Sequence, residues 1–185
     1  MPALYRVLPY LPSARPRSPG HPTYAPRSTG RSRVDNPGLY EVLYLGDSAA
    51  GAVAEAFGNL RSWDAGLFRG TPALPGSQRA LVHYELSDGV GVCDMDDADR
   101  LVELGLRPSQ VVTRDRTVTQ GWAARIFEQG RFAGVRWWSY YDPRWGSFGL
   151  WDTADLRVVA TEVLDSLDHP AVVEAADVLC RVIRR

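Results

Sequence analysis

The fold of this chain is constrained most by two strand-like segments that follow one another without a helix between them. Residues 134–138 (GVRWW) and 147–151 (SFGLW) are rich in aromatic and branched side chains, and tyrosine, aspartate, proline and glycine fill the turn between them. Such segments are typical of strands bounded by a turn. Adjacent strands of this kind favour a mixed α+β sheet over a strictly parallel, doubly wound one.

The rest of the chain alternates between expected strands and expected helices. Further strands are predicted at 3–8, 39–45, 79–86, 91–94 and 156–164. Helical spacing of apolar residues predicts helices at 49–60, 97–104 and 117–129. The last segment is also expected to be a helix, capped by Asp168, with Pro170 in its first turn and an apolar stripe that reaches Ile183.

Residues 11–33 have a composition unlike the rest of the chain. This stretch holds five prolines and five arginines and no acidic residue. Proline fixes φ and lacks a donor N–H, so a helix is excluded and a long loop is predicted. The segment before it is too short to fold alone, and 185 residues suit one domain. We therefore expect a single domain over residues 1–185 that contains this loop.

Composition excludes several classes of protein. The net charge of −1 gives no general attraction to nucleic acid or to an anionic membrane. No apolar run approaches the roughly 20 residues of a transmembrane helix, and the first residues do not resemble a signal peptide. We therefore expect a cytoplasmic protein.

The three histidines lie far apart and predict no metal site, and Cys93 and Cys180 are expected to be reduced core residues.

The common nucleotide and hydrolase motifs are absent from the sequence. It contains no phosphate-binding P-loop, no dinucleotide-binding G-x-G-x-x-G after a strand, and no G-x-S-x-G elbow. These absences argue against the common dehydrogenases, nucleoside triphosphatases and α/β-hydrolases.

Three local features suggest chemistry. The loop 30–38 (GRSRVDNPG) offers arginines that can clamp a phosphate, although a lone loop arginine is usually solvated. Tyr44 ends a strand and Glu55 lies in the next helix, where taken alone it is expected to face water. The aromatic segment 134–152 predicts either a core or a pocket for a flat ring. Within it, Ser139 supplies a hydroxyl that can orient a ligand amide, but no neighbouring histidine makes it a nucleophile.

An arginine in the first expected strand, Arg6 in LYRVLP, precedes these features. In this order the motifs resemble those of the RES domain, a family similar to NAD-consuming toxins of bacterial toxin–antitoxin pairs. The family pattern runs from an early strand with an arginine to a Gly-Arg-aromatic-Asn/Asp loop, a strand ending in tyrosine, a helix with glutamate and a Gly-x-x-aromatic-x-Ser strand. The matching residues are Arg6, Arg33, Tyr44, Glu55 in AVAEAF, and Ser139 in GVRWWS.

The loop arginine has two possible matches. Arg33 stands in Arg33-Val34-Asp35, where Val34 replaces the usual aromatic residue, and Arg31 competes because it follows a glycine. The step of 11 residues from Tyr44 to Glu55 fits the family. The resemblance covers the chain from Arg6 to about Asp152.

The resemblance implies a fold similar to that of ADP-ribosyltransferases, a mixed split sheet with flanking helices around an NAD cleft. It implies NAD⁺ as substrate rather than cofactor, inorganic phosphate as an optional co-substrate, no metal, and a helix-turn-helix antitoxin that covers the cleft. The implied activity is cleavage of the nicotinamide–ribose bond by phosphorolysis or hydrolysis. The implied catalytic residues are Glu55, Arg33 and Tyr44, and the implied substrate-binding residues are Arg6, Arg31 and Ser139.

Two other functions fit the same residues. An ADP-ribosyltransferase would use the same site to modify a macromolecule. A binding module without catalysis would use the arginines of the 11–33 loop to contact an acidic partner.

Overall fold

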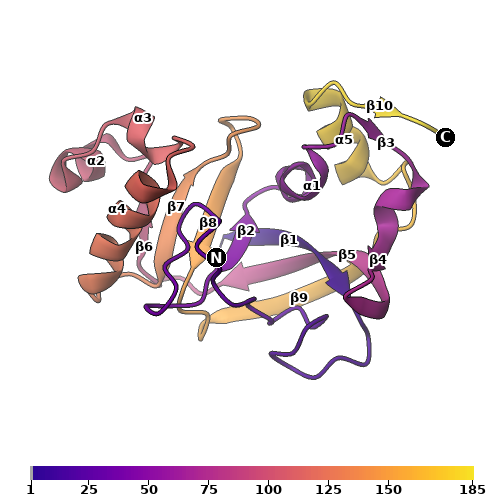
Figure 1. Cartoon of the computed structure of the whole chain (residues 1–185), viewed down its shortest axis with the longest axis horizontal. Helices are drawn as coiled ribbons and strands as arrows, with labels where there is room; N and C mark the ends of the chain where they lie inside the picture. Colours follow the sequence, from indigo (N-terminus) through magenta and orange to yellow (C-terminus); the bar gives the residue numbers. More distant parts are fainter. Residues whose placement is uncertain (1) are drawn as a thin grey trace.

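The structure of the chain is a computed structural model that describes residues 2–185 (Figure 1). Its strands are β1 (Ala3–Tyr10), β2 (Leu43–Gly46), β3 (Ser62–Trp63), β4 (Arg69–Thr71), β5 (Leu74–Leu86), β6 (Val92–Asp94), β7 (Gly134–Trp138), β8 (Gly146–Leu150), β9 (Leu156–Val163) and β10 (Val182–Ile183). Its helices are α1 (Ala49–Phe57), α2 (Ala98–Leu104), α3 (Pro108–Val111), α4 (Arg116–Glu128) and α5 (Pro170–Val178), with a 3₁₀ turn η1 (Ala65–Phe68).

Eight strands form the main sheet, in the order β4-β5-β1-β2-β8-β7-β6, and β9 pairs with residues 80–86 of β5, beyond the stretch of β5 that pairs with β4. Every pairing within it is antiparallel except that of β6 with β7. The predicted hairpin is the antiparallel pair β7–β8. The expected α+β class with a mixed sheet is therefore confirmed.

The sheet is split between β1 and β2. β1 pairs with β5 along its whole length, whereas within residues 2–185 its pairing with β2 is limited to Tyr5 and Gly46. Figure 1 shows the consequence, because β7 and β8 run steeply in that view while β1, β5 and β9 run across it. The split opens space between the two halves of the sheet, at the end of β2 where α1 begins.

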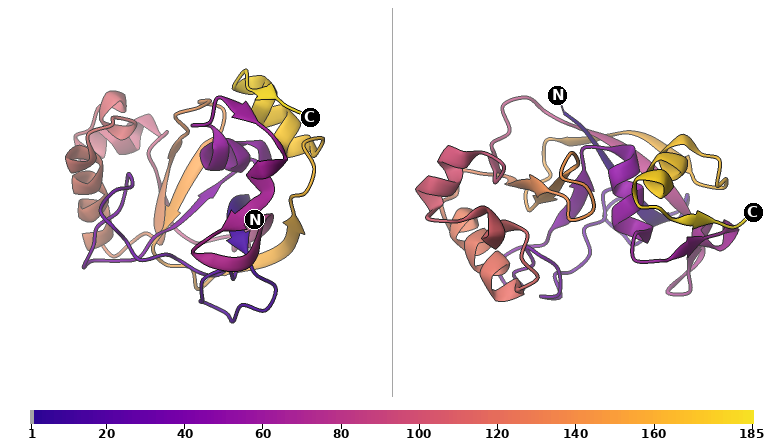
Figure 2. Two further views of the ribbon diagram at one scale, coloured as in Figure 1. Left: turned by 45° about the vertical axis from the view of Figure 1, so that its right-hand side comes forward. Right: turned by 90° about the horizontal axis from the view of Figure 1, so that it is seen from above.

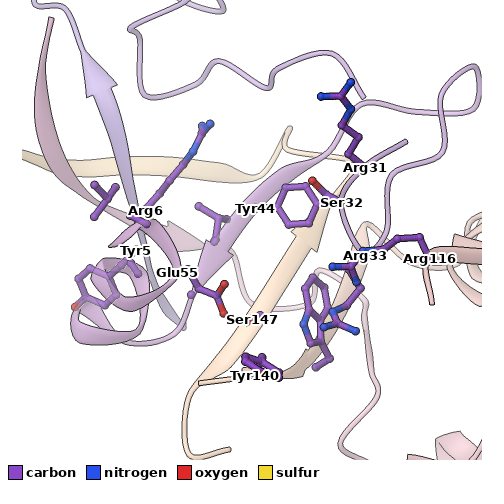
Figure 3. Close-up of a pocket in the computed structure, with 16 residues that line it drawn as sticks. Tyr5, Arg6, Arg31, Ser32, Arg33, Tyr44, Glu55, Arg116, Tyr140 and Ser147 are labelled. Carbon is purple, nitrogen blue, oxygen red and sulfur yellow. The ribbon is translucent and has the colours of Figure 1, made fainter. Parts of the chain in front are cut away.

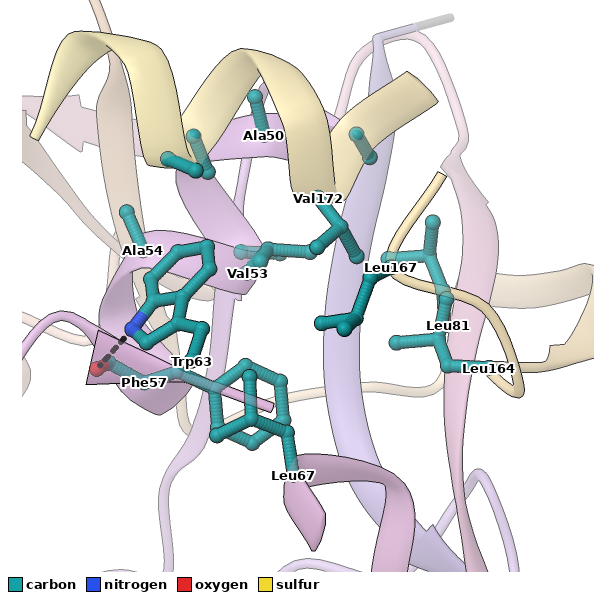
Figure 4. Close-up of a cluster of buried hydrophobic side chains, with 14 of the residues drawn as sticks. Ala50, Val53, Ala54, Phe57, Trp63, Leu67, Leu81, Leu164, Leu167 and Val172 are labelled. Atoms are coloured by element: carbon teal, nitrogen blue, oxygen red, sulfur yellow. Dashed lines mark hydrogen bonds between the residues drawn. The ribbon is translucent and has the colours of Figure 1, made fainter. Parts of the chain in front are cut away.

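The helices form two groups at opposite ends of this sheet (Figure 2). At one end α1 and α5 cover β1 and β5, and their shared core includes Val53, Leu81 and Val172 (Figure 4). Trp63 is fully buried in the same cluster and donates its indole N–H to the carbonyl of Phe57 at 3.2 Å. At the other end α4 packs on β7 through a separate core. The two halves thus have their own hydrophobic support on either side of the split.

The segment between β1 and β2 forms neither helix nor strand and crosses the other face of the sheet. Tyr84 of β5 donates its hydroxyl to the carbonyl of Pro22 at 2.8 Å. Nη1 of Arg6 donates to the carbonyl of Tyr24, also at 2.8 Å. Ala25 packs against the apolar cluster on this face. The loop is therefore held by side chains of the central strands.

Several predicted elements differ from the structure in their bounds. β5 begins at Leu74 rather than at residue 79, and α1 ends at Phe57 rather than at residue 60. The strand expected at 39–45 begins only at Leu43, because Leu39 and Tyr40 donate their backbone N–H groups to the carbonyl of Asn36 and form a turn. The last helix begins after His169 rather than Asp168 and ends at Val178.

The end of α5 has a clear physical cause. Cys180 has a φ of 51°, and the N–H groups of Cys180 and Arg181 donate to the carbonyls of Asp177 and Ala176. This is the Schellman pattern that closes a helix. Ile183 therefore belongs to β10, which pairs with β3, and Cys180 is exposed rather than buried as expected.

In the described part of the chain, no helix is long and apolar enough to cross a membrane.

Candidate functional site

A cavity of about 420 Å³ lies at the split in the sheet (Figure 3). Its walls come from β1, the loop before β2, β2 itself, α1, the first turn of α4 and the β7–β8 hairpin. The lining residues include Tyr5, Arg6, Arg31, Ser32, Arg33, Tyr44, Glu55, Arg116, Trp137, Tyr140 and Ser147. The volume is within the range of small-molecule sites, which is roughly 300–1,000 Å³.

Glu55 lies on the cavity wall formed by α1. Ser48 caps this helix by accepting the N–H of Gly51 at 3.2 Å. The helix buries Val53 and Phe57 against α5 and β5, which leaves Glu55 on the opposite face. Glu55 is solvent-exposed, as expected, and its exposed side chain lines the cavity. Burial of the rest of α1 therefore fixes the direction in which the carboxylate points.

Ser139 contacts Glu55 from the turn that follows β7. Its Oγ donates to Oε1 of Glu55 at 2.7 Å and accepts the N–H of Tyr141 at 3.2 Å. A hydroxyl has one proton, so acceptance from Tyr141 leaves that proton for the glutamate. The Tyr141 ring packs so closely on Gly58, at the end of α1, that a Cβ there would lie 2.7 Å from it. The turn and the helix are thus locked together around the carboxylate.

Asp35 organises the loop that forms the opposite wall. It is buried, and its carboxylate accepts from the Tyr44 hydroxyl at 2.7 Å and from the N–H groups of Ser32 at 3.1 Å and Thr29 at 3.3 Å. Burial, reinforced by the hydrogen bond to Asp35, raises the pKa of Tyr44 well above its usual value. Tyr44 therefore stays a neutral phenol, and its ring stands edge-on to Trp137 at the cavity.

Arg33 is fixed at the cavity, whereas Arg31 is exposed at its rim. Nη1 of Arg33 donates to the carbonyls of Val111 at 2.8 Å and Thr113 at 3.0 Å. Burial, together with the positive charge of Arg116, lowers the pKa of Arg33. Of the two candidate loop arginines, Arg33 is the one whose guanidinium the protein holds in place.

Val34, which replaces the aromatic residue of the family pattern, is fully buried beside β8. A Cβ on Gly149 would lie only 2.8 Å from Cγ2 of Val34. Because Gly149 has no side chain, the loop that carries Val34 can lie close to β8. This close approach places Arg33 at the cavity.

Arg6 has a different position from the other predicted site residues. It borders the cavity, but its guanidinium points away from Glu55 toward the 11–33 loop (Figure 3). There it donates to the carbonyl of Tyr24 and lies in hydrogen-bonding reach of Tyr84. Burial lowers the pKa of Arg6. In this structure Arg6 therefore secures the loop.

Sequence reasoning missed several residues of this site. Arg116 reaches the cavity from the start of α4, Tyr5 from β1, and Tyr140 from the hairpin turn, where it is 61% exposed. The helix start at Arg116 carried a signal, because Asp115 caps it by accepting the N–H of Thr117 at 2.9 Å. No pattern in the sequence indicated which loop that helix end would face. Of the other aromatic residues of the segment, Trp145 and Phe148 are buried in the cores, and Trp138, Tyr141 and Trp151 are partly buried and pack against them.

The fold and the cavity at its split define an α+β domain with a mixed, split sheet flanked by helices. The family model of the RES domain matches residues 3–171, and the chain belongs to the RES domain family. Its fold is similar to that in the crystal structure of the M. tuberculosis MbcT–MbcA toxin–antitoxin complex, with a TM-score of 0.61 and 14% sequence identity over 96% of this chain and 88% of that chain. No curated protein matches the chain.

Proposed function

We propose that this protein degrades NAD⁺ by cleaving the bond between nicotinamide and ribose, and that it acts as the toxin of a toxin–antitoxin pair. The observation that carries the proposal is the position of Glu55, which Ser139 orients at a cavity whose opposite wall bears Arg33 and Arg116. One cavity thus offers a carboxylate for a developing cation and guanidinium groups for phosphates. The family to which the chain belongs supports the same activity.

The proposed reaction passes through a ribose with oxocarbenium character, as glycoside hydrolysis does. Nicotinamide leaves as a neutral molecule from a cationic pyridinium, so its departure requires no general acid. The carboxylate of Glu55 stabilises the positive charge that develops on the ribose, and such preorganised groups lower a barrier by several kcal/mol. Water or inorganic phosphate then attacks the ribose carbon. The products are nicotinamide and either ADP-ribose with a released proton or ADP-ribose 1″-phosphate.

The other predicted site residues would bind the substrate. Tyr44 presents an aromatic ring for the nicotinamide or the ribose, and Arg33 suits phosphate oxygens because guanidinium forms paired hydrogen bonds with them. Arg31 lies on the rim, where it can contact the same phosphates. Ser139 acts on Glu55 in the free protein, and Arg6 shapes the cavity by holding the loop. No metal or further cofactor takes part in this scheme.

A protein partner is part of the proposal. The structurally similar MbcT is described in a toxin–antitoxin complex. A chain that destroys cellular NAD⁺ in the cytoplasm must be restrained in its own cell, so we propose an antitoxin of the helix-turn-helix type that covers the mouth of the cavity. The proposal includes no role for membranes or for direct nucleic-acid binding.

The test is to incubate the purified chain with NAD⁺, with and without inorganic phosphate, and to follow nicotinamide by chromatography. Glu55→Gln keeps the shape of the side chain and removes its charge, so we expect loss of turnover with NAD⁺ binding largely retained. Glu174→Gln, on α5 away from the cavity, is the matched control.

Each outcome decides a separate point. Dependence on phosphate identifies phosphorolysis, and turnover without phosphate identifies hydrolysis. Equal turnover by Glu55→Gln and the parent would refute the role of Glu55. Transfer of label from NAD⁺ to a macromolecule would show an ADP-ribosyltransferase instead.

A further inference from the structure

Arg116 has charge and hydrogen-bonding capacity that the protein itself does not use. It occupies the first position of α4 and lines the cavity. Its Nη1 atom is buried and has no hydrogen-bond partner. It forms no salt bridge with any carboxylate in the part of the chain that the structure describes. A buried, unpaired donor on a cation is costly, so its persistence at a cavity points to a ligand.

Arg33 lies beside Arg116 on the same wall of the cavity (Figure 3). The two hydrogen bonds that fix Arg33 both start from Nη1, which leaves Nε and Nη2 of the guanidinium for another acceptor. The charge of Arg116 contributes to the lowered pKa of Arg33, as expected of two cations that repel each other. No acidic side chain is salt-bridged to either residue within residues 2–185.

The distance between the two arginines is set by bonds between α4 and the loop. Thr119 of α4 donates its hydroxyl to the carbonyl of Arg33 at 2.6 Å. The side chain of Gln120 donates to the carbonyls of Gly30 at 2.8 Å and Ser32 at 3.0 Å. These bonds hold the two guanidinium groups together against their repulsion. The positive end of the α4 dipole adds to their field.

We propose that Arg33 and Arg116 form one anion subsite, and that this subsite binds a phosphate group opposite Glu55. Paired guanidinium groups suit the tetrahedral oxygens of phosphate, because each presents several N–H donors in a fixed plane. The inference deepens the proposed function and rests on it for the identity of the molecule that carries the phosphate. Two sources share this chemistry, the pyrophosphate of NAD⁺ and free inorganic phosphate.

The test is to measure binding of inorganic phosphate, ADP-ribose and uncharged adenosine by calorimetry. Arg116→Ala is compared with Arg125→Ala, which removes an exposed arginine from the same helix. We expect Arg116→Ala to weaken binding of the phosphate-bearing probes by roughly ten-fold or more, as for a lost charged hydrogen bond. Arg125→Ala and the affinity for adenosine should remain unchanged. Arg116→Lys keeps the charge without the planar donors and should recover only part of the affinity, and thermal unfolding verifies that each variant folds.

Titration of phosphate into chain saturated with ADP-ribose distinguishes the two sources. Competition assigns the subsite to the pyrophosphate, and independent binding assigns it to free phosphate. The proposal is wrong if the parent binds neither anionic probe, or if Arg116→Ala binds them as tightly as Arg125→Ala does. Arg116→Ala can lose ADP-ribose binding while the parent releases no nicotinamide from NAD⁺. That pair of results would support the subsite and refute only the proposed function.

Discussion

The hydroxyl of Ser139 donates a hydrogen bond of 2.7 Å to Oε1 of Glu55 and joins the β7–β8 hairpin to α1. Ser139 is itself buried, and its backbone N–H donates to the carbonyl of Trp145 at 2.7 Å. The carboxylate therefore has a fixed orientation before any substrate enters. In the proposed reaction such a partner acts through Glu55, and we therefore propose that Ser139 is a positioning residue.

Replacement of Ser139 by alanine tests this relationship. Loss of one hydrogen bond to a charged group is worth about 1.5–3 kcal/mol, so we expect kcat for nicotinamide release to fall by roughly ten- to a hundred-fold. KM for NAD⁺ should change less, because the residue orients the carboxylate rather than the substrate. Steady-state kinetics measures both constants. Ser109→Ala, at an exposed position of α3, is the control. A rise in KM with constant kcat would instead show that Ser139 binds substrate directly.

The bond between Tyr44 and Asp35 supports a second prediction. Tyr44→Phe removes the hydroxyl that donates to the buried Asp35 carboxylate at 2.7 Å, and Asp35→Asn removes the charge that accepts it. We expect each change to lower the free energy of unfolding by about 1–3 kcal/mol. Because both act on the same bond, the double variant should lose less than the sum of the two single losses. Urea unfolding of the four proteins gives the coupling energy, and strict additivity would show that the two side chains act independently.

Local sequence patterns were enough for the main strands and helices but not for contacts between distant segments. Aromatic and branched residues around a turn indicated the β7–β8 hairpin, and apolar spacing indicated the helix that carries Glu55, so the sheet type and the exposed position of Glu55 could be predicted. Arg116 could not be placed at the site, because its contact with the Arg33 loop depends on bonds such as that of Thr119 to the Arg33 carbonyl. Tertiary packing of this kind leaves no periodic signal.

Short or irregular elements also escaped prediction for physical reasons. The two-residue strands β3 and β10 exist only because Ser62 and Trp63 lie beside Val182 and Ile183. The helix α5 ends at a cysteine in the left-handed region, where glycine is the usual stop signal, so the apolar stripe continued past the true end. The resemblance to the family supplied what periodicity lacks, because it assigned Arg33, Tyr44 and Glu55 to one site.

The two cysteines should differ in reactivity. Cys93 is buried, and burial raises the pKa of its thiol to about 11, so little thiolate exists at pH 8. Cys180 is exposed at the end of α5. We expect iodoacetamide to modify Cys180 alone in the native protein and both cysteines in urea, as measured by intact mass and peptide mapping. Cys180→Ser should then show no native labelling, and rapid labelling of Cys93 in the native state would contradict its burial.

Tyr84 makes stability depend on pH in the alkaline range. Burial raises the pKa of its phenol to about 12, and only the protonated hydroxyl can donate to the Pro22 carbonyl. The unfolded chain ionises this group near pH 10, so its contribution is complete below that pH and disappears as pH rises from about 10 to 12. A shift of this size corresponds to a loss of roughly 2–3 kcal/mol in the free energy of unfolding of the parent over this pH range. Tyr84→Phe lacks the phenol, so its free energy of unfolding should fall less steeply as pH rises.

Urea unfolding of the parent and of Tyr84→Phe between about pH 9 and 11.5 checks this expectation. At neutral pH the variant should be less stable by about 1 kcal/mol, because it loses the hydrogen bond that holds the loop at Pro22. The difference between the two proteins should shrink as pH rises and change sign before about pH 11.5, since only the parent loses stability by ionisation of this residue. Tyr140→Phe, which removes an exposed hydroxyl, is the control. A stability difference that stays constant across the range would mean that Tyr84 ionises equally easily in the folded and unfolded chains.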